Sequence, residues 1–448
     1  MNCKPKLIVF SLILLLLSSC WKEDNYVSEG VLLDFSADTM AFDTVFTQMG
    51  TTTRQFMVYN RSNQPVRIRE VTLQGGRASR FRLNVDGDTN LVAQNLIIGA
   101  GDSMFVFVRA NINPNLQTEP FLIEDAVLFR FDDGDQRLPL TAYGRNAVYH
   151  VPTDTIRYSD GTRPTDLFGN PYAYSVIDCG QWRHDLPHVI IGYAVIDSRN
   201  TLSLTAGDEL YFAPNSVLWV YDSATLDVRG TADRPVLFTS LRHDGWYSFL
   251  PGQWGYIWMG KGSVNNHIEH AVIENGYLGI TADSCANANP TLQLNNVQIR
   301  NHTLAGLIGN TARIVADNLL ITSCGTATLA LQYGGDYTFS HCTLADYWRY
   351  DRRTVPSVQV TNYRDYDGIH YVWPIQANFS DCIIYGTLAN ELYLELDSLA
   401  PVHAAFTHCL IRGGEWDEDP LFVDPSEGDY HLQDDSPALG IGYQFTDK

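Results

Sequence analysis

One short pattern recurs through the second half of the chain and constrains its fold more than any other feature. The pattern is apolar-x-[His/Asn/Asp]-apolar-x-apolar, and it begins at residues 268, 294, 316, 339, 379 and 406. The starts are therefore 26, 22, 23, 40 and 27 residues apart. A period in the twenties is typical of solenoids, in which each turn buries its inward side chains against the next turn. We predict the coils of a parallel β-helix.

The third position of this pattern is occupied only by histidine, asparagine or aspartate. The six residues are His270, Asn296, Asn318, His341, Asp381 and His408. These residue types are enriched where the backbone is left-handed, so we expect a bend between two strands at each of them. Residues in adjacent coils would lie about 4.8 Å apart, and the alternative is a metal site or catalytic relay of His341, Asp381 and His408. We favour the bend, and we predict no metal and no cofactor.

Cysteines follow this position in the last three repeats and are expected to point inward. They are Cys342, Cys382 and Cys409. Strand spacing brings stacked cysteines within disulfide range, but parallel side chains rarely reach the required dihedral angle. We therefore expect a buried column of free thiols.

The start of the chain is typical of a bacterial secretion signal. Two lysines precede an apolar run at residues 7–17, which has about half the roughly 20 residues needed to span a bilayer. The run ends in Leu17-Ser18-Ser19-Cys20, which resembles the lipobox of bacterial lipoproteins. This resemblance implies that residues 1–19 are removed and that Cys20 is acylated, which would anchor the protein permanently in outer-membrane lipid.

The residues after Cys20 are similar to a surface-export signal. Residues 21–24 combine a lysine with two acidic residues, as in Bacteroidetes-type lipoproteins that reach the cell surface. A solvated tether is the alternative interpretation, and residues 20–30 are expected to serve as the tether in either case. The predicted location is the outer membrane, with the lipid-anchored protein facing the cell surface.

Residues 31–146 are predicted to form a β-sandwich. Short alternating stretches are separated by turn signals, and seven or so strands of this kind suggest two packed sheets. The clearest stretches are residues 55–59, 66–69, 104–108 and 127–131. The acidic turn at residues 132–135 is expected to join two strands as a hairpin.

This region also resembles a known type of immunoglobulin-like domain. The resemblance, to the abnormal-spindle/hydin type, rests on residues 58–68 and 98–103. Members of that group are mostly packing and docking modules. Residues 147–177 follow with no clean period and are expected to form a linker or a covering segment.

Residues 178–442 resemble right-handed parallel β-helix proteins of the pectin-lyase-like superfamily. The likeness rests on residues 202–204 and 230–240 near its start and on residues 419–424 and 436–440 near its end. These motifs are specific for the fold, and they match the catalytic motifs of no lyase family. The predicted fold class of the whole chain is therefore all-β, with an N-terminal immunoglobulin-like β-sandwich followed by a right-handed parallel β-helix.

The charge balance argues against nucleic acid as a partner. The chain has 51 acidic residues against 30 lysines and arginines, which gives a net charge of −21. That surplus repels phosphate backbones. Only five residues are lysines, and Lys261 is the one that lies away from the ends of the chain.

The 40-residue spacing between the fourth and fifth repeats indicates an insertion that is rich in aromatic residues and arginines. Flat apolar faces together with bidentate donors suit a sugar ring, an acidic glycan or a protein partner. The alternative is that these aromatics cover the flank of the helix. We predict a binding surface that favours protein over glycan, formed by Tyr347, Trp348, Arg349, Arg352, Arg353, Tyr366 and Trp373.

Catalysis by this fold would need an acid and base set. A lyase needs a basic residue beside the substrate α-carbon, and the candidates are Lys261, Arg352 and Arg353. A hydrolase needs one acid and one base on a strand face, and the repeats lack paired aspartates of that kind.

We therefore predict a non-catalytic surface lipoprotein that serves as a rigid interaction platform. Its partner would be another envelope protein, in outer-membrane protein assembly or in glycan uptake. The first alternative is a surface polysaccharide lyase or glycoside hydrolase, and the second is a glycan-binding module without turnover. Superfamily likeness alone supports the enzyme, because fold does not imply function.

Overall fold

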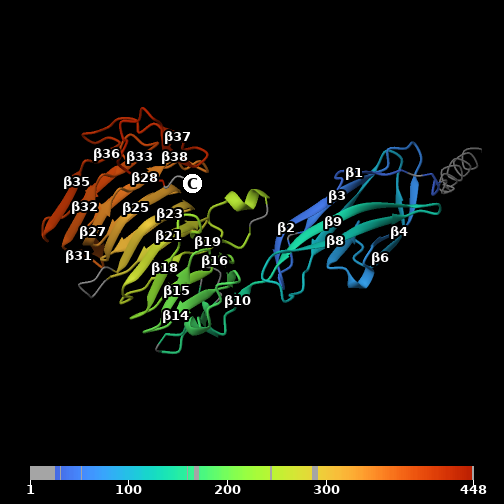
Figure 1. Ribbon diagram of the computed structural model, residues 1–448, viewed down its shortest axis with the longest axis horizontal. Coiled ribbons are helices and arrows are strands. Elements are labelled where there is room, and N and C mark those ends of the chain that lie inside the picture. Colours follow the sequence, from blue (N-terminus) through green and yellow to red (C-terminus); the bar gives the residue numbers. More distant parts are fainter. Residues whose placement is uncertain are drawn as a thin grey trace, which may run out of the picture. The chain divides into compact units, whose positions relative to one another are not determined.

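The computed structural model describes residues 26–30, 32–51, 53–158, 160–165, 171–242, 245–284 and 291–445. These residues form an all-β structure whose helical segments are the short 3-10 turns Gly76–Ala78 (η1), Cys179–Gln181 (η2) and Gly245–Phe249 (η3). The chain divides into two compact units, residues 1–146 and 147–448 (Figure 1). Within the described residues, no helix has the length and apolar character needed to cross a membrane. Cys20 and the tract at residues 21–24 lie outside the described residues.

The first unit contains two sheets, with strand orders β1-β3-β7-β5 and β2-β9-β8-β4-β6. Neighbouring strands are antiparallel except for β2 and β9, which are parallel. The strands are Asp34–Phe35 (β1), Met40–Phe46 (β2), Arg54–Tyr59 (β3), Val66–Leu73 (β4), Phe81–Val85 (β5), Val92–Ile98 (β6), Ser103–Ala110 (β7), Phe121–Arg130 (β8) and Asp135–Arg145 (β9).

The two sheets of the first unit share one apolar core. Alternate residues of β3 and β7 are buried, and Phe56 on β3 meets Phe129 on β8 edge-on with ring centroids 6.3 Å apart. The Phe131 N–H donates to the Gly134 carbonyl across the predicted acidic turn, which joins β8 to β9. The four predicted stretches and the hairpin are therefore confirmed as strands and a turn.

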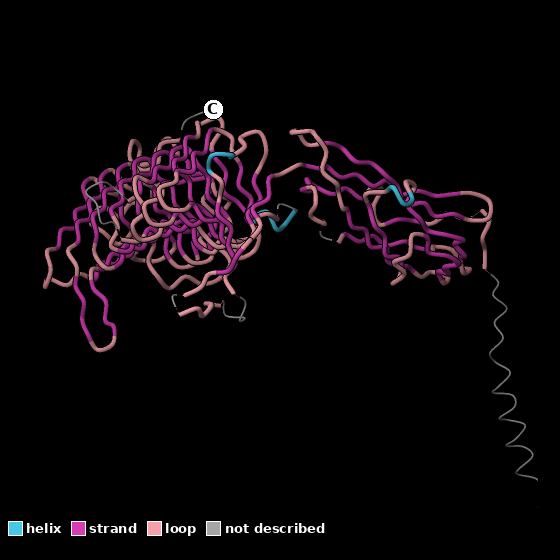
Figure 2. The backbone as a smooth tube through the Cα atoms, turned by 90° about the horizontal axis from the view of Figure 1, so that it is seen from below, coloured by secondary structure: helices cyan, strands magenta, loops and turns pink. Residues whose placement is uncertain are grey.

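The second unit is built on a large parallel sheet of fifteen strands. Figure 2, with strands in magenta, shows them stacked and joined by loops. The strands are Val148–His150 (β10), His188–Ile190 (β13), Thr201–Thr205 (β15), Glu209–Phe212 (β16), Thr225–Arg229 (β18), Val236–Ser240 (β19), Asn266–Glu274 (β21), Leu292–His302 (β23), Arg313–Cys324 (β25), Gly335–Ser340 (β27), Thr343–Asp346 (β28), Ile375–Ser380 (β32), Ile383–Gly386 (β33), Val402–Thr407 (β35) and Leu410–Ile411 (β36).

A second sheet of ten strands runs beside it, and its strands alternate in sequence with those of the large sheet. They are Asp154–Thr155 (β11), Ala173–Val176 (β12), Tyr193–Ile196 (β14), Val217–Val220 (β17), Ile257–Met259 (β20), Leu278–Ala282 (β22), Ala305–Asn310 (β24), Ala327–Gln332 (β26), Val358–Thr361 (β29) and Leu392–Glu395 (β34). Two hairpins lie outside the sheets, Tyr363–Tyr366 with Ile369–Val372 (β30, β31) and Phe422–Asp424 with Asp429–Leu432 (β37, β38).

The predicted bends divide the large sheet into two rows of strands. Before His270, β21 pairs with β18, and after His270 the same strand pairs with β19. Later coils keep this division as separate strands, such as β27 and β28. All six residues at the third position of the repeat are left-handed, with φ between 48° and 56°. The bend hypothesis is confirmed, and the coils have the alternation expected of a parallel β-helix.

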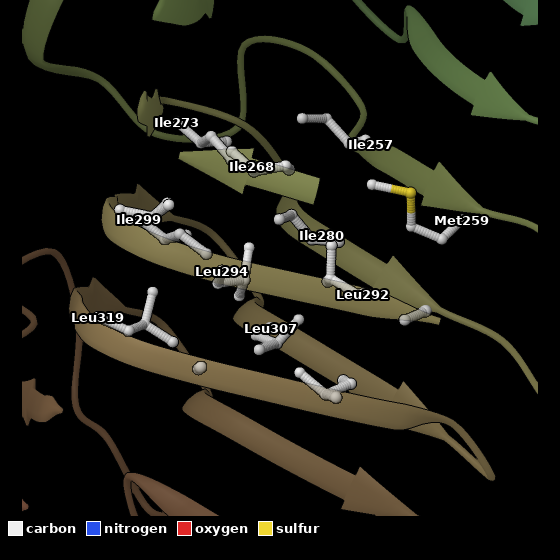
Figure 3. Close-up of a cluster of buried hydrophobic side chains, with 14 of the residues drawn as sticks. Ile257, Met259, Ile268, Ile273, Ile280, Leu292, Leu294, Ile299, Leu307 and Leu319 are labelled. Atoms are coloured by element: carbon white, nitrogen blue, oxygen red, sulfur yellow. The ribbon is translucent and has the colours of Figure 1, made fainter. Parts of the chain in front are cut away.

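The inward side chains of successive coils stack on one another. Figure 3 shows aliphatic residues of four coils, among them Ile268, Leu294 and Leu319, meeting in one buried cluster. Further along the stack, the rings of Phe339, Phe379 and Phe406 lie 5.0 and 4.8 Å apart and nearly parallel. The predicted column of Cys342, Cys382 and Cys409 is buried, and all three thiols are free.

The segment predicted as a linker or cover contributes strands to the stack. Residues 148–150 (β10) pair in parallel with β13, and residues 173–176 (β12) pair in parallel with β14. The sequence shows no clean period here because these strands are short and only partly buried. This part of residues 147–177 is thus the first coil of the stack.

Candidate functional site

The aromatic-rich insertion consists of two extensions at opposite ends of one strand. Residues 347–357 connect β28 to β29, and the hairpin β30–β31 connects β29 to β32. Because β29 pairs with β26, it belongs to the stack itself. The predicted binding residues are therefore divided: Tyr347 to Arg353 lie in the first extension, while Tyr366 and Trp373 lie on the second.

A buried ionic cluster fixes the first extension. The Arg353 side chain is 1% exposed, and its guanidinium donates to both carboxylate oxygens of Glu391 at 2.9 and 2.8 Å. Its Nε lies 3.1 Å from Asp346 Oδ2, but without the angle of a hydrogen bond. Glu391 also accepts hydrogen bonds from the Ser357 N–H and hydroxyl. The bidentate pair with Glu391 is therefore the main attachment of Arg353.

This burial corrects two of the predicted surface residues. Arg353 has no surface that a ligand could reach, so it serves neither as a binding residue nor as a lyase base. Trp348 is 9% exposed, and its Nε1 donates to Asp351 Oδ1 at 2.7 Å. Sequence alone cannot show this, because the partner Glu391 lies 38 residues further along the chain.

The exposed part of the first extension borders a cleft of about 540 Å³. Its floor is the outward face of the strand row that follows the bends, where Glu274, Arg300 and Thr322 succeed one another on β21, β23 and β25. Its walls come from three separate segments of the chain. They are η3 with Ser248 and Phe249, the first extension with Tyr347, Arg349 and Tyr350, and the C-terminal segment with residues 426–428 and Phe445.

A second row of left-handed residues builds one wall of this cleft. Each floor strand has one such residue at its end. They are Asn275, Asn301 and Ser323, with φ of 66°, 61° and 53°. The Asn301 amide donates to Asn275 Oδ1 at 2.6 Å and to the Phe249 carbonyl at 2.8 Å. Asn275 in turn donates to the Ser248 carbonyl at 2.9 Å. The asparagine pair thus holds η3 in place. This row follows the repeat by a few residues and could have been found from the sequence.

The charges in the cleft are paired with one another. Arg300 Nε donates to Glu274 Oε2 at 2.9 Å, and Arg349 lies 3.8 Å from Glu427 Oε1. The two arginines and the two glutamates therefore cancel formally. Burial raises the pKa of Tyr347, which is neutral at physiological pH. Such a site offers amides, hydroxyls and paired charges, which suit a neutral hydroxylated ligand better than an anion.

Two aromatic side chains stand at the rim of the cleft. Phe249 is 64% exposed and Tyr350 is 40% exposed. The Tyr350 hydroxyl donates to the Phe249 carbonyl at 2.5 Å, which ties the first extension to η3. Exposed rings on fixed backbone provide flat apolar faces for a ligand.

The remaining lyase candidates lie elsewhere. Lys261 is exposed in the loop between β20 and β21, whereas the cleft begins at the other end of β21. Arg352 is exposed and does not line the cleft. The structure therefore does not bring the predicted bases together.

The second extension presents a separate aromatic surface. Tyr366 is 61% exposed, and the Arg364 guanidinium lies 4.9 Å from the centre of its ring. His370 contacts two carboxylates: its Nδ1 lies 2.7 Å from Asp365 Oδ1, and its Nε2 lies 2.9 Å from Asp397 Oδ2. The hydrogen bonds to these carboxylates raise the pKa of His370. Asp397 lies beyond β34, so this contact pins the hairpin to the last coil. Trp373, at the base of the hairpin, is half-buried.

The part of the chain that the structure describes contains no group of three or more His, Cys, Asp or Glu side chains placed to hold a metal. Of the predicted relay, His408 contacts Asp381, whereas His341 contacts Asp317. His408 Nδ1 lies 2.6 Å from Asp381 Oδ1, and His341 Nδ1 lies 3.1 Å from Asp317 Oδ1. These are contacts along the row of bends.

No family model and no curated protein matches the chain. Among solved structures, a family 123 glycoside hydrolase from Clostridium perfringens is 7% identical, with 26% of this chain and 30% of that chain covered and a TM-score of 0.19. The VesB protease of Vibrio cholerae is 11% identical, with 25% and 31% covered and a TM-score of 0.18. A PapD-like domain of human CEP192 is 10% identical, with 28% and 97% covered and a TM-score of 0.18. The chain thus spans under a third of the first two structures.

The buried cluster makes a prediction about pH. Burial raises the pKa of Asp346 to about 7 from its usual value near 3.8, so the folded protein holds this proton to a higher pH than the unfolded chain does. The protonated Asp346 side chain therefore contributes fully to the free energy of unfolding at pH values below the pKa of the unfolded chain. This contribution is lost as the pH rises through about 7. We expect the unfolding free energy of the second unit to fall by roughly 1 to 3 kcal/mol more in the wild type than in Asp346→Asn between about pH 5 and pH 8. Denaturant unfolding at both pH values measures this difference, and equal slopes for the two proteins would contradict it.

Proposed function

We propose that this protein is a non-catalytic lipoprotein of the outer membrane that faces the cell surface and serves as a rigid interaction platform. In this proposal, Cys20 carries the lipid, and the partner is another envelope protein, engaged in outer-membrane protein assembly or glycan uptake. We further propose that the first unit is an immunoglobulin-like domain of the abnormal-spindle/hydin type. The second unit is then a right-handed parallel β-helix of the pectin-lyase-like superfamily.

One observation supports this proposal most: two exposed aromatic surfaces are held rigidly on one coil, at the two ends of β29. The first surface, Arg349 with Tyr350, is fixed by the buried pair of Arg353 with Glu391. The second surface, Arg364 with Tyr366, is fixed by the contact of His370 with Asp397. Aromatic and arginine side chains dominate the binding energy of protein interfaces. Holding them on fixed backbone lowers the entropy that binding must overcome.

The cleft geometry disfavours the lyase alternative. A lyase must neutralise the carboxylate of its substrate with a cation or an acid group, and the cations of the cleft are already paired. In the cleft, Arg300 is already paired with Glu274 and Arg349 lies beside Glu427. Lys261 and Arg352 do not line it.

A neutral glycan is the second candidate ligand, and the cleft favours it. Asn275, Asn301 and the exposed Phe249 all line the cleft. Sugar rings combine an apolar face with hydroxyl groups, and this arrangement presents a partner for each.

Loss of either aromatic surface tests the platform. We expect the double variant Arg364→Ala with Tyr366→Ala to lower the amount of partner recovered with the full-length protein from its own outer membrane by about tenfold, because such residues are typical hot spots. Tyr221→Ala, which removes a 42% exposed ring elsewhere on the stack, is the matched control. Quantitative mass spectrometry of the detergent extract measures recovery. The platform would be contradicted if partner recovery stayed unchanged both for Arg364→Ala with Tyr366→Ala and for Arg349→Ala with Tyr350→Ala.

The anchor is tested separately at Cys20. Cys20→Ala should abolish incorporation of labelled palmitate and release the protein from the membrane fraction, because acyl chains supply the membrane affinity. Cys179→Ala keeps the predicted lipobox and should label normally. Loss of the wild-type protein on protease treatment of intact cells would support the outward orientation, while full protection would contradict it.

Glycan binding is tested at the rim of the cleft. Phe249→Ala should weaken retention on neutral glycan affinity gels by about tenfold, since a stacking ring is lost. Trp246→Ala is the matched control, because Trp246 lies in the same short helix, is 71% exposed and does not line the cleft. Equal retention of both variants would remove the cleft from consideration as a glycan site.

A further inference from the structure

The last coil of the stack leaves its core open. In earlier coils the inward residues of the ten-stranded sheet are fully buried, as Val358 and Val360 on β29 are. The residues in register with them on β34 are Leu392 and Leu394, and Leu394 is 43% exposed. On β35, Val402 is in register with the buried Ile375 and is 41% exposed. Side chains that point into the core elsewhere thus meet solvent here.

Both sheets also end at this coil. Among residues 291–445, the ten-stranded sheet ends at β34, and the large sheet ends at β35 before the bend and at β36 after it. Neither β34 nor β35 has a further strand on its outer side in this part of the chain. Figure 1 shows β35 at the end of the row that runs through β27 and β32. The backbone groups of an outer strand are hydrogen-bonding sites that another strand can satisfy.

The C-terminal segment contacts the last coil at Leu410 on β36, after the bend, and leaves Leu394 and Val402 exposed. Its apolar residues, among them Phe422, Tyr430 and Ile441, pack on the outward face of β25, β28 and β33 through Leu320, Ala345 and Ile383. The exposed apolar residues Leu394, Leu399 and Val402 lie on β34, on the loop that follows it and on β35, and we call this surface the open end.

The open end is acidic. Residues 392–411, which follow the buried Glu391, contain two carboxylates, Glu395 and Asp397, and no lysine or arginine. Glu395 is exposed on β34 itself. A second copy of this chain would bring the same acidic coil to the contact, and like charges at an interface are unfavourable. A basic partner complements it.

We propose that the open end binds an extended segment of a partner protein by adding a strand to the stack. The segment pairs with β34 or β35 through its backbone, places alternate apolar side chains against Leu394 and Val402, and carries lysine or arginine opposite Glu395. Strand addition is an established way for an exposed sheet edge to bind a peptide. The inference rests on the platform function, and it names the chemical class of the partner and the surface that meets it.

Photo-crosslinking in the native membrane tests this inference. A benzophenone amino acid replaces Val402 in the full-length protein. The matched control carries the benzophenone amino acid in place of Leu439, which is 57% exposed on the C-terminal segment. We expect an adduct from position 402 only. Peptide mass spectrometry should place it on a segment of another protein with alternating apolar residues and at least one lysine or arginine.

A charge reversal completes the test. Glu395→Lys should lower the yield of this adduct by about tenfold, whereas Glu418→Lys, an exposed site on the C-terminal segment, should leave it unchanged. An adduct between two copies, or one on a helical or acidic segment, would overturn the inference. So would the absence of an adduct while the wild-type protein still co-purifies with its partner. That last outcome would leave the platform function standing. If the wild-type protein co-purified with no partner at all, the platform function itself would be contradicted.

Discussion

The left-handed bend between two strand rows is the constraint on which the rest of the second unit depends. Each bend turns the chain without interrupting the coil, so that the strand before it and the strand after it both remain in register with the coil below. Asparagine, aspartate and histidine accept this backbone at modest cost, and their side chains link neighbouring coils, as the 2.7 Å bond from Asn318 to Asn296 shows. With register fixed in this way, the inward side chains align into one continuous core.

The same regularity explains where the irregular parts lie. A coil can accept extra residues only at its corners, because residues within a strand are held by pairing on both sides. The two extensions around β29 follow this rule. The C-terminal segment packs on the outward face of β25, β28 and β33, and the part of the face of β21, β23 and β25 that it leaves open becomes the floor of the cleft. The proposed binding surfaces lie where this covering stops.

The sequence predicted the repetitive part well and the surface poorly, for one physical reason. A residue such as Asn318 or Cys382 has its environment fixed by the coils beside it, so its position in the repeat is sufficient to place it. Arg353 has its environment fixed by Glu391, which no period connects to it. The cleft likewise joins η3, the first extension and the C-terminal segment, and its Asn275 and Asn301 gain a role only once these segments meet.

The attachment of the C-terminal segment also dictates an order of assembly. Most coils pair with a neighbour between twenty and thirty residues away, and contacts of such short separation form early. In contrast, the Tyr443 N–H bonds to Thr343 across 100 residues, and Gln444 exchanges bonds with Asn318 across 126 residues. The strands can therefore wind up progressively as the chain emerges, whereas the cleft is completed only after the segment that carries Phe445 has folded back. A ligand of the cleft would therefore bind only to the fully folded protein.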